Sequence, residues 1–122
     1  MSEAPRNLVV LLTHGPESEM SSVGMTIANG GMTAGMKVSL FLTGGGVDIV
    51  RKRATDLTHV APLSPLSELI ADFQARGGVI WACPPCVKSR GYEQSDLIDG
   101  VTIVGASLMH ELIAGGAGTL SF

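Results

Sequence analysis

Aromatic residues, cysteines and histidines are all scarce in this chain of 122 residues. Only 4% of the residues are aromatic and only two are cysteine. The core must therefore be built from aliphatic side chains, and a framework of several disulfides is excluded. The three histidines are His14, His59 and His110. None is paired with another at the spacing of a zinc finger, so the sequence argues against a zinc site and we expect no metal.

An excess of positive charge and a long apolar run are also missing. The net charge is −3, which leaves no basic face for nucleic acid. No apolar stretch approaches the roughly 20 residues that span a bilayer. Met1 to Arg6 is too short and polar for a signal peptide. We therefore expect a cytoplasmic protein with no membrane role, where two closely spaced cysteines indicate catalysis or metal binding rather than a structural disulfide.

The length and composition favour one small domain that completes its burial by association. Hydrophobic residues make up 45% of the chain, and 16 residues are glycine. The mean hydropathy of +0.35 makes the chain mildly hydrophobic. We expect a single domain over residues 1–122 that forms a homo-oligomer.

Short apolar runs alternate with helical patterns along the chain. Such alternation predicts a parallel sheet with right-handed crossovers and with helices on both faces. The expected strands are 7–13, 38–42, 79–82, 101–104 and 119–122, and the expected helices are about 17–34, 47–53, 65–76, 84–90 and 108–114. Ser64 and Ser107 are the expected caps of the third and fifth helices, and the basic run 51–53 is expected at the end of the second.

Three of these helices carry apolar residues at the spacing of one core-facing side. In the first helix, Met25 and Met32 lie two turns apart on a flank, which indicates core packing or a subunit contact. The residues expected to face the core are Met20, Val23, Ile27 and Ala28, then Leu66, Leu69, Ile70 and Phe73, then Met109, Leu112 and Ile113.

The two cysteines stand at the junction of a predicted strand and a predicted helix. With Cys83 as the helix cap, Pro84 falls at the first helical position, which suits proline, and Cys86 sits one turn inside. The unpaired N–H groups of the helix start, with Lys88 and Arg90 nearby, would lower the pKa of the Cys83 thiol. Cys83 is therefore a candidate nucleophile. The alternative is that either cysteine is a small apolar filler of the core.

Loops that follow parallel strands share one edge of the sheet, where ligands bind. The loops expected to meet there are 14–16, 43–46, 83–86 and 105–107. Backbone N–H groups of Gly44 and Gly45 would then hold an anionic sulfur species. His14 could donate to that sulfur or act as a base, and it could equally be bonded to backbone. Lys88 and Arg90 could instead be solvated helix charges.

A thioredoxin-like dithiol is one interpretation of the CPPC motif, since a CxxC pair near a βαβ unit is typical of redox proteins. Trp81 would supply the nearby aromatic ring. The position of the motif argues against it, because Cys83 and Cys86 lie in the last third of the chain. A thioredoxin fold needs the motif early, with an antiparallel half downstream.

The ordered set of motifs resembles the DsrE/DsrF-like family of small sulfur-relay proteins, over nearly the full length. Above all the resemblance lies in the segment from Ala82 to Gly91, ACPPCVKSRG. The other resembling segments are 13–16 (THGP), 41–47 (FLTGGGV), 65–70 (PLSELI), 96–101 (DLIDGV), 104–106 (VGA) and 120–122 (LSF).

This resemblance implies a fold, an activity and partners. The fold would be a three-layer α/β/α domain with a five-stranded, mainly parallel sheet, assembled as a homotrimer or homohexamer. The activity would be sulfur trafficking, in which a cysteine eight residues before Gly91, namely Cys83, accepts sulfane sulfur as a persulfide. The partners would be a persulfide donor and an acceptor thiol on a protein or a small molecule, and no cofactor is needed.

Cys86 departs from the members of the family that work with a single cysteine at this site. A second thiol one turn away could discharge a loaded Cys83 as a disulfide with release of sulfide, so a reductase-like or peroxiredoxin-like activity is an alternative. A third possibility is a structural or regulatory oligomer with inert cysteines. In such a protein the pKa of Cys83 would be unperturbed, at about 8.5.

Overall fold

The computed structural model describes residues 6–122, so residues 1–5, which carry most of the expectation about a signal peptide, lie outside it. All strand pairs in the described chain are parallel, and the strand order is β4-β3-β2-β1-β5. This confirms the predicted five-stranded parallel sheet and excludes a thioredoxin fold. The strands are β1 Asn7–Leu12, β2 Lys37–Leu42, β3 Val79–Ala82, β4 Val101–Ile103 and β5 Gly118–Ser121.

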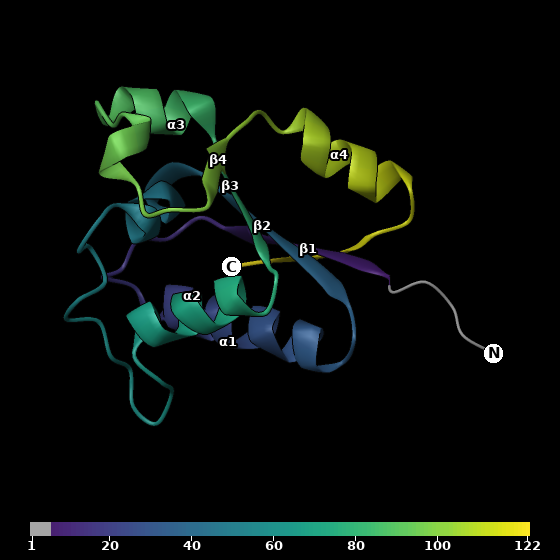
Figure 1. The fold of residues 1–122 in the computed structure, drawn as a ribbon, viewed down its shortest axis with the longest axis horizontal. Helices are drawn as coiled ribbons and strands as arrows, with labels where there is room; N and C mark the ends of the chain where they lie inside the picture. The colour runs from purple at the N-terminus through teal and green to yellow at the C-terminus, as the bar shows by residue number, and fades with distance from the viewer. Residues whose placement is uncertain (1–5) are drawn as a thin grey trace.

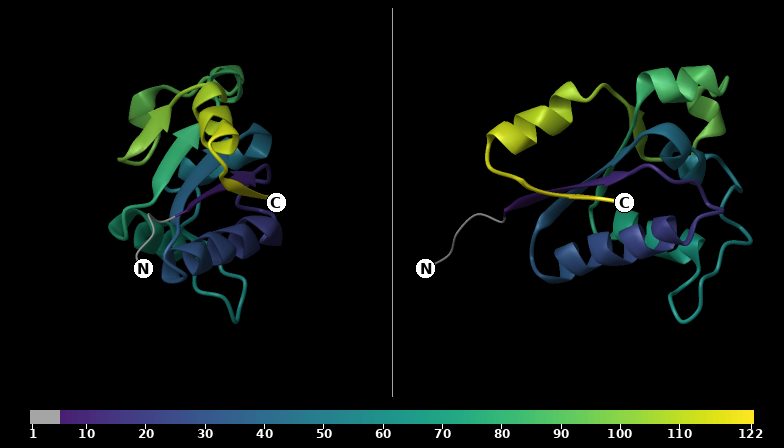
Figure 2. Two further views of the ribbon diagram at one scale, coloured as in Figure 1. Left: turned by 90° about the vertical axis from the view of Figure 1, so that its right-hand side faces the viewer. Right: turned by 180° about the vertical axis from the view of Figure 1, so that it is seen from behind.

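Helices cover both faces of the sheet, as the sequence predicts. In Figure 1, α1 and α2 lie on one side of the sheet and α4 on the other, and the view from behind in Figure 2 agrees. The short α3 and the 3-10 helix η1 lie near each other at the ends of β3 and β2. The bounds are α1 Glu19–Thr33, η1 Gly44–Val50, α2 Leu66–Ala75, α3 Pro84–Ser89, η2 Gln94–Asp96 and α4 Ser107–Ala114.

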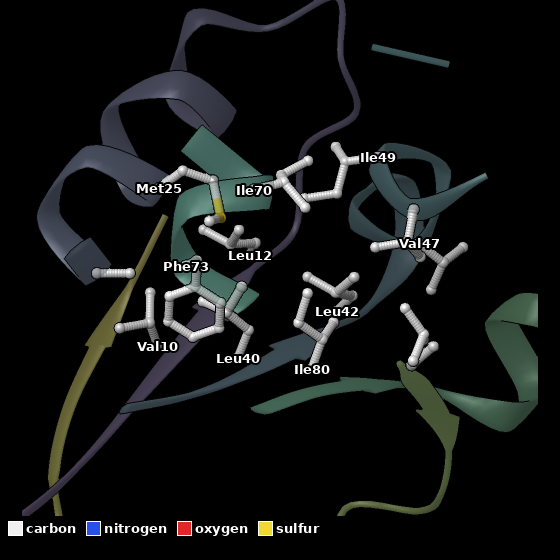
Figure 3. Close-up of a cluster of buried hydrophobic side chains, with 14 of the residues drawn as sticks. Val10, Leu12, Met25, Leu40, Leu42, Val47, Ile49, Ile70, Phe73 and Ile80 are labelled. Atoms are coloured by element: carbon white, nitrogen blue, oxygen red, sulfur yellow. The ribbon is translucent and has the colours of Figure 1, made fainter. Parts of the chain in front are cut away.

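The core fills the space between the sheet and the pair α1 and α2. Strand side chains alternate between faces, so the paired residues Val10, Leu40 and Ile80 all point to this side. They meet Phe73 of α2, which is fully buried, and Figure 3 shows the ring among them. This cluster continues to Val87 of α3, which ties the start of the CPPC helix to the core.

The buried side of α1 is rotated from the predicted one. Met20 and Ile27, expected in the core, are 36% and 38% exposed. The cause is close packing at Gly24, where an added Cβ would collide with the side chain of Leu12. Small residues therefore occupy much of the side that faces the sheet, while Met25 and Ala28 are buried there, as expected for both. The buried residues of α1 are Ser21, Ser22, Gly24, Met25, Ala28 and Asn29.

The predicted side of α4, with Met109, Leu112 and Ile113, does face the sheet, but it is only partly buried. No residue of α4 is buried, and Ile113 is 37% exposed. Met109 and Ile113 instead line an open groove of about 440 Å³ beside β5. The reason is geometric, because a single helix of eight residues crosses this face and cannot cover five strands.

Many predicted element boundaries shift by a few residues, and two helix caps and the second helix show this clearly. The cap of α2 is Pro65 rather than Ser64, because Pro65 has the extended ψ of 143°. The cap of α4 is Ala106 rather than Ser107. The second helix starts at Gly44 and ends at Val50, so residues 51–53 follow it, and Arg53 has a positive φ of 71°. Within residues 6–122, no helix is both long enough and apolar enough to cross a membrane.

Candidate functional site

Cys83 lies where β3 passes into α3. Its backbone N–H donates to the carbonyl of Leu42 at 2.9 Å, which extends the pairing with β2 by one residue. Its own carbonyl accepts from the N–H of Val87 at 3.0 Å. Cys83 is thus the cap of α3 with Pro84 at the first helical position, as predicted. Its side chain, however, makes no capping hydrogen bond to the helix start.

The sulfur of Cys86 lies between Cys83 and the turn after β2. The Cys86 thiol donates to Cys83 Sγ, with the two sulfurs 3.0 Å apart. On its other side, Cys86 Sγ accepts from the backbone N–H of Gly44 at 3.1 Å. Both thiols are partly exposed and free of any disulfide. The expected N–H donor is therefore present, but it reaches Cys86 rather than Cys83.

The surroundings of Cys83 raise the pKa of its thiol, whereas the sequence predicts a lowered pKa. Burial raises the pKa of Cys83 above its ordinary value, and the neighbouring thiol of Cys86 raises it further. The backbone N–H of Cys86 acts in the opposite sense and offsets part of this effect. The N–H of Cys86 at the helix start thus lowers the pKa of Cys83 as predicted, but burial and the Cys86 thiol outweigh it, so the net shift in the free dithiol is upward rather than downward as expected.

The turn after β2 is held by close backbone packing. A Cβ at Gly46 would collide with the carbonyl of Leu12, and one at Gly45 would lie 3.1 Å from the N of Gly15. Gly44 has a φ of +52°, a conformation that glycine adopts without strain. The glycines thus bring the loops after β1 and β2 together and place the Gly44 N–H at the sulfur.

A polar cluster that sequence reasoning missed fixes the far end of α3. Asp48 Oδ1 accepts from the hydroxyl of Tyr92 at 2.6 Å and from Nε of Arg90 at 3.1 Å. Arg51 stacks over the Tyr92 ring, with its guanidinium carbon 5.5 Å from the ring centre. The hydrogen bond to Asp48 and burial raise the pKa of Tyr92. No motif or spacing in the sequence marks Asp48 and Tyr92.

Neither predicted cation forms a hydrogen bond to a sulfur within residues 6–122. Arg90 is committed to the ion pair with Asp48 and donates to the carbonyl of Cys86 at 3.3 Å. Its role in the structure is to join α3 to η1. Lys88 is exposed on α3, and among the described residues it has no ion pair.

His14 and the loop after β4 complete the predicted set. Nδ1 of the exposed His14 lies 3.3 Å from the hydroxyl of Thr13, so its imidazole bonds locally. Val104 donates to the carbonyl of Ala82 at 3.2 Å, which places the end of β4 beside β3. Among hydrogen bonds of residues 6–122, none joins the 105–107 loop or the His14 ring to a cysteine.

The sequence of this chain matches a known protein family. The whole described stretch, residues 6–122, matches the DsrE/DsrF-like family. The chain belongs to the DsrE/DsrF-like family. This membership, together with the fold, points to a function related to sulfur relay.

Individual relatives agree with the family in fold and length. The uncharacterized protein MJ0989 of Methanocaldococcus jannaschii is 29% identical over 106 residues, which cover 86% of this DsrE/DsrF-like chain and 87% of MJ0989. The structure of ychN from E. coli matches with a TM-score of 0.77 at 18% identity, covering 97% of this chain and 99% of ychN. MTH1491 from Methanobacterium thermoautotrophicum matches with a TM-score of 0.74 at 16% identity, covering 96% and 99%. At these identities the structures establish the fold alone.

Proposed function

We propose that this DsrE/DsrF-like protein traffics sulfur by accepting sulfane sulfur as a persulfide on Cys83 and passing it to an acceptor thiol. The observation that carries the proposal is the position of Cys83. It is a partly exposed thiol at the carboxyl end of β3, at the sheet edge where parallel α/β proteins bind ligands. Family membership supports the choice of sulfur as the cargo.

The chemistry needs only thiols and persulfides. The Cys83 thiolate attacks the outer sulfur of a donor persulfide, the sulfur–sulfur bond of the donor breaks, and the donor leaves as a thiolate. An acceptor thiolate then attacks the outer sulfur of the Cys83 persulfide, and Cys83 leaves as a thiolate. The sulfur atom moves with no net oxidation or reduction, so no cofactor is required.

The proposal extends to partners, assembly and location. The partners are a persulfide donor and an acceptor thiol, on a protein or a small molecule. Assembly as a homotrimer or homohexamer is supported by exposed apolar side chains on α1, α4 and β5, including Met20, Ile27, Ile113 and Leu120. The proposed location is the cytoplasm, a reducing compartment in which a closely spaced pair of thiols stays available for chemistry.

Intact-mass spectrometry of three variants tests the assignment of Cys83. The protein, Cys83→Ser and Cys86→Ser are each exposed to glutathione persulfide without oxygen. Cys86→Ser should gain the mass of one sulfur atom, and Cys83→Ser should gain none. A glutathione adduct on Cys86→Ser in place of one sulfur would contradict the proposal, because the sulfane sulfur would then never have resided on Cys83.

A further inference from the structure

The sulfur of Cys86 is held in direct contact with the sulfur of Cys83. Cys86 Sγ lies 3.0 Å from Cys83 Sγ and is held from behind by the N–H of Gly44 at 3.1 Å. Cys86 is thus positioned to act on Cys83.

Contacts of two residues that follow Cys86 keep it in this place. Val87, the next residue, is 3% exposed and packs into the core. One turn on, Arg90 joins Asp48 of η1, and the same carboxylate accepts from Tyr92. Gly44 and Asp48 belong to the same short helix, so η1 contacts both the Cys86 sulfur and the end of α3.

We infer that the protein is also a persulfide reductase: Cys86 discharges a persulfide on Cys83 and releases its outer sulfur as sulfide. This inference rests on the proposed function, because it needs the sulfane sulfur to reside on Cys83. The substrate class is a low-molecular-weight or protein persulfide, and the products are a thiol, sulfide and the Cys83–Cys86 disulfide.

The atoms and electrons of this step balance. Cys86 loses its proton to solvent, and its thiolate attacks Cys83 Sγ, the inner sulfur of the persulfide. A bond forms between Cys83 Sγ and Cys86 Sγ, the bond to the outer sulfur breaks, and that sulfur leaves as hydrosulfide. The dithiol is oxidised by two electrons and the sulfane sulfur is reduced to sulfide. Two equivalents of a thiol such as glutathione then restore the dithiol by exchange.

The direction of attack follows from the positions of the sulfurs. Cys86 Sγ lies 3.0 Å from Cys83 Sγ, which becomes the inner sulfur when a persulfide forms, so the inner sulfur is the one within reach of Cys86. An acceptor thiol arriving from solvent meets the outer sulfur instead, which gives transfer. Release and transfer therefore start from the same loaded Cys83 and differ in which of its two sulfurs is attacked.

A single-turnover sulfide assay with a mass measurement tests the inference. The protein is reduced and then freed of the added thiol reductant. It is mixed with one equivalent of glutathione persulfide without oxygen, and the released sulfide is trapped with monobromobimane. The full protein should release about one sulfide per chain and lose two hydrogens. Cys86→Ser, the matched control, should lose most of that release and retain one added sulfur.

The outcomes separate the two proposals. If the full protein retains a stable added sulfur and releases no sulfide, the reductase inference is overturned and the carrier proposal stands. If Cys86→Ser gains glutathione instead of sulfur, the carrier proposal fails and the inference fails with it. Circular dichroism of the full protein and of Cys86→Ser first establishes that each is folded.

Discussion

The two faces of the sheet differ in how completely they are covered. On the α1 and α2 side, Ile70 is 4% exposed and Phe73 is fully buried. On the α4 side, Ile113 is 37% and Val79 is 41% exposed. The free energy of folding therefore comes mainly from one face, while the other retains apolar surface that a second copy could cover.

The cysteines lie at the edge of the sheet where the core ends, and Cys86 packs against the last residues of that core. There Val87 anchors α3 from the core side, and the Asp48 cluster anchors it from the solvent side. Stability and chemistry are thus separable. Substitutions on the packed face should unfold the protein, whereas those at the edge should change sulfur chemistry with smaller effects on folding.

Truncating the same residue type on each face gives the largest expected difference. Ile70→Ala should cost about 2–5 kcal/mol, because it leaves a cavity in a dry core. Ile113→Ala should cost about 1 kcal/mol or less, because the side chain is already partly solvated. Urea unfolding measures both. Equal costs would contradict the comparison, and an Ile113 cost that grows with protein concentration would show that a second copy covers α4.

Removing the Asp48 carboxylate tests the solvent-side anchor. Asp48→Ala should cost about 1–2 kcal/mol, a value reduced by the partial exposure of the pair. It should also slow sulfide release, because Cys86 is held less firmly against Cys83. Tyr92→Phe is the milder control and should cost about 0.5–1.5 kcal/mol.

The readouts of the Asp48 experiment separate positioning from folding. Sulfide is measured at a temperature where Asp48→Ala remains folded. Sulfur loading is measured with Asp48→Ala combined with Cys86→Ser, which lacks the discharging thiol. Unchanged loading with slower release supports a positioning role. A parallel loss of loading would mean that the whole edge is disturbed.

The pH dependence of Cys83 alkylation gives the smallest expected shift. Because burial and Cys86 raise the pKa of Cys83, less thiolate is present at neutral pH, and the rate should climb as the pH rises through the raised pKa. In Cys86→Ala the contribution of the neighbouring thiol is gone and burial remains. The profile should therefore move to lower pH. Peptide mapping with iodoacetamide follows residue 83, and a profile that stays in place would refute the role of Cys86.

Sequence patterns predict local features of this molecule better than contacts between elements. The strand Val79–Ala82 and the cap at Cys83 follow from an apolar run and a proline, which act locally. The rotation of α1 does not, because it depends on Gly24 meeting Leu12 from another element. Patterns that assign large apolar residues to the core miss such close approaches.

The same limit applies at the site. That Gly44 lies on the same side as the cysteines follows from the shared edge of parallel strands, which the alternation of strands and helices predicts. The strand order that makes β2 and β3 neighbours is given by the structure. That the Gly44 N–H reaches Cys86 and not Cys83 depends on the φ of one glycine and the start of a six-residue helix. Arg90 carries the expected charge, but its partner Asp48 lies 42 positions away in sequence and cannot be found from spacing.

Tracing isotope-labelled sulfur through Cys83 tests the central claim most directly. Cys86→Ser, which cannot discharge its persulfide, is loaded with glutathione persulfide that carries a heavy sulfur isotope in its outer position. It is then freed of the donor and given an acceptor thiol. The label should appear first on the peptide that contains Cys83 and then on the acceptor, with the protein returned to its starting mass. A label that reaches the acceptor without ever residing on Cys83 would contradict the carrier function.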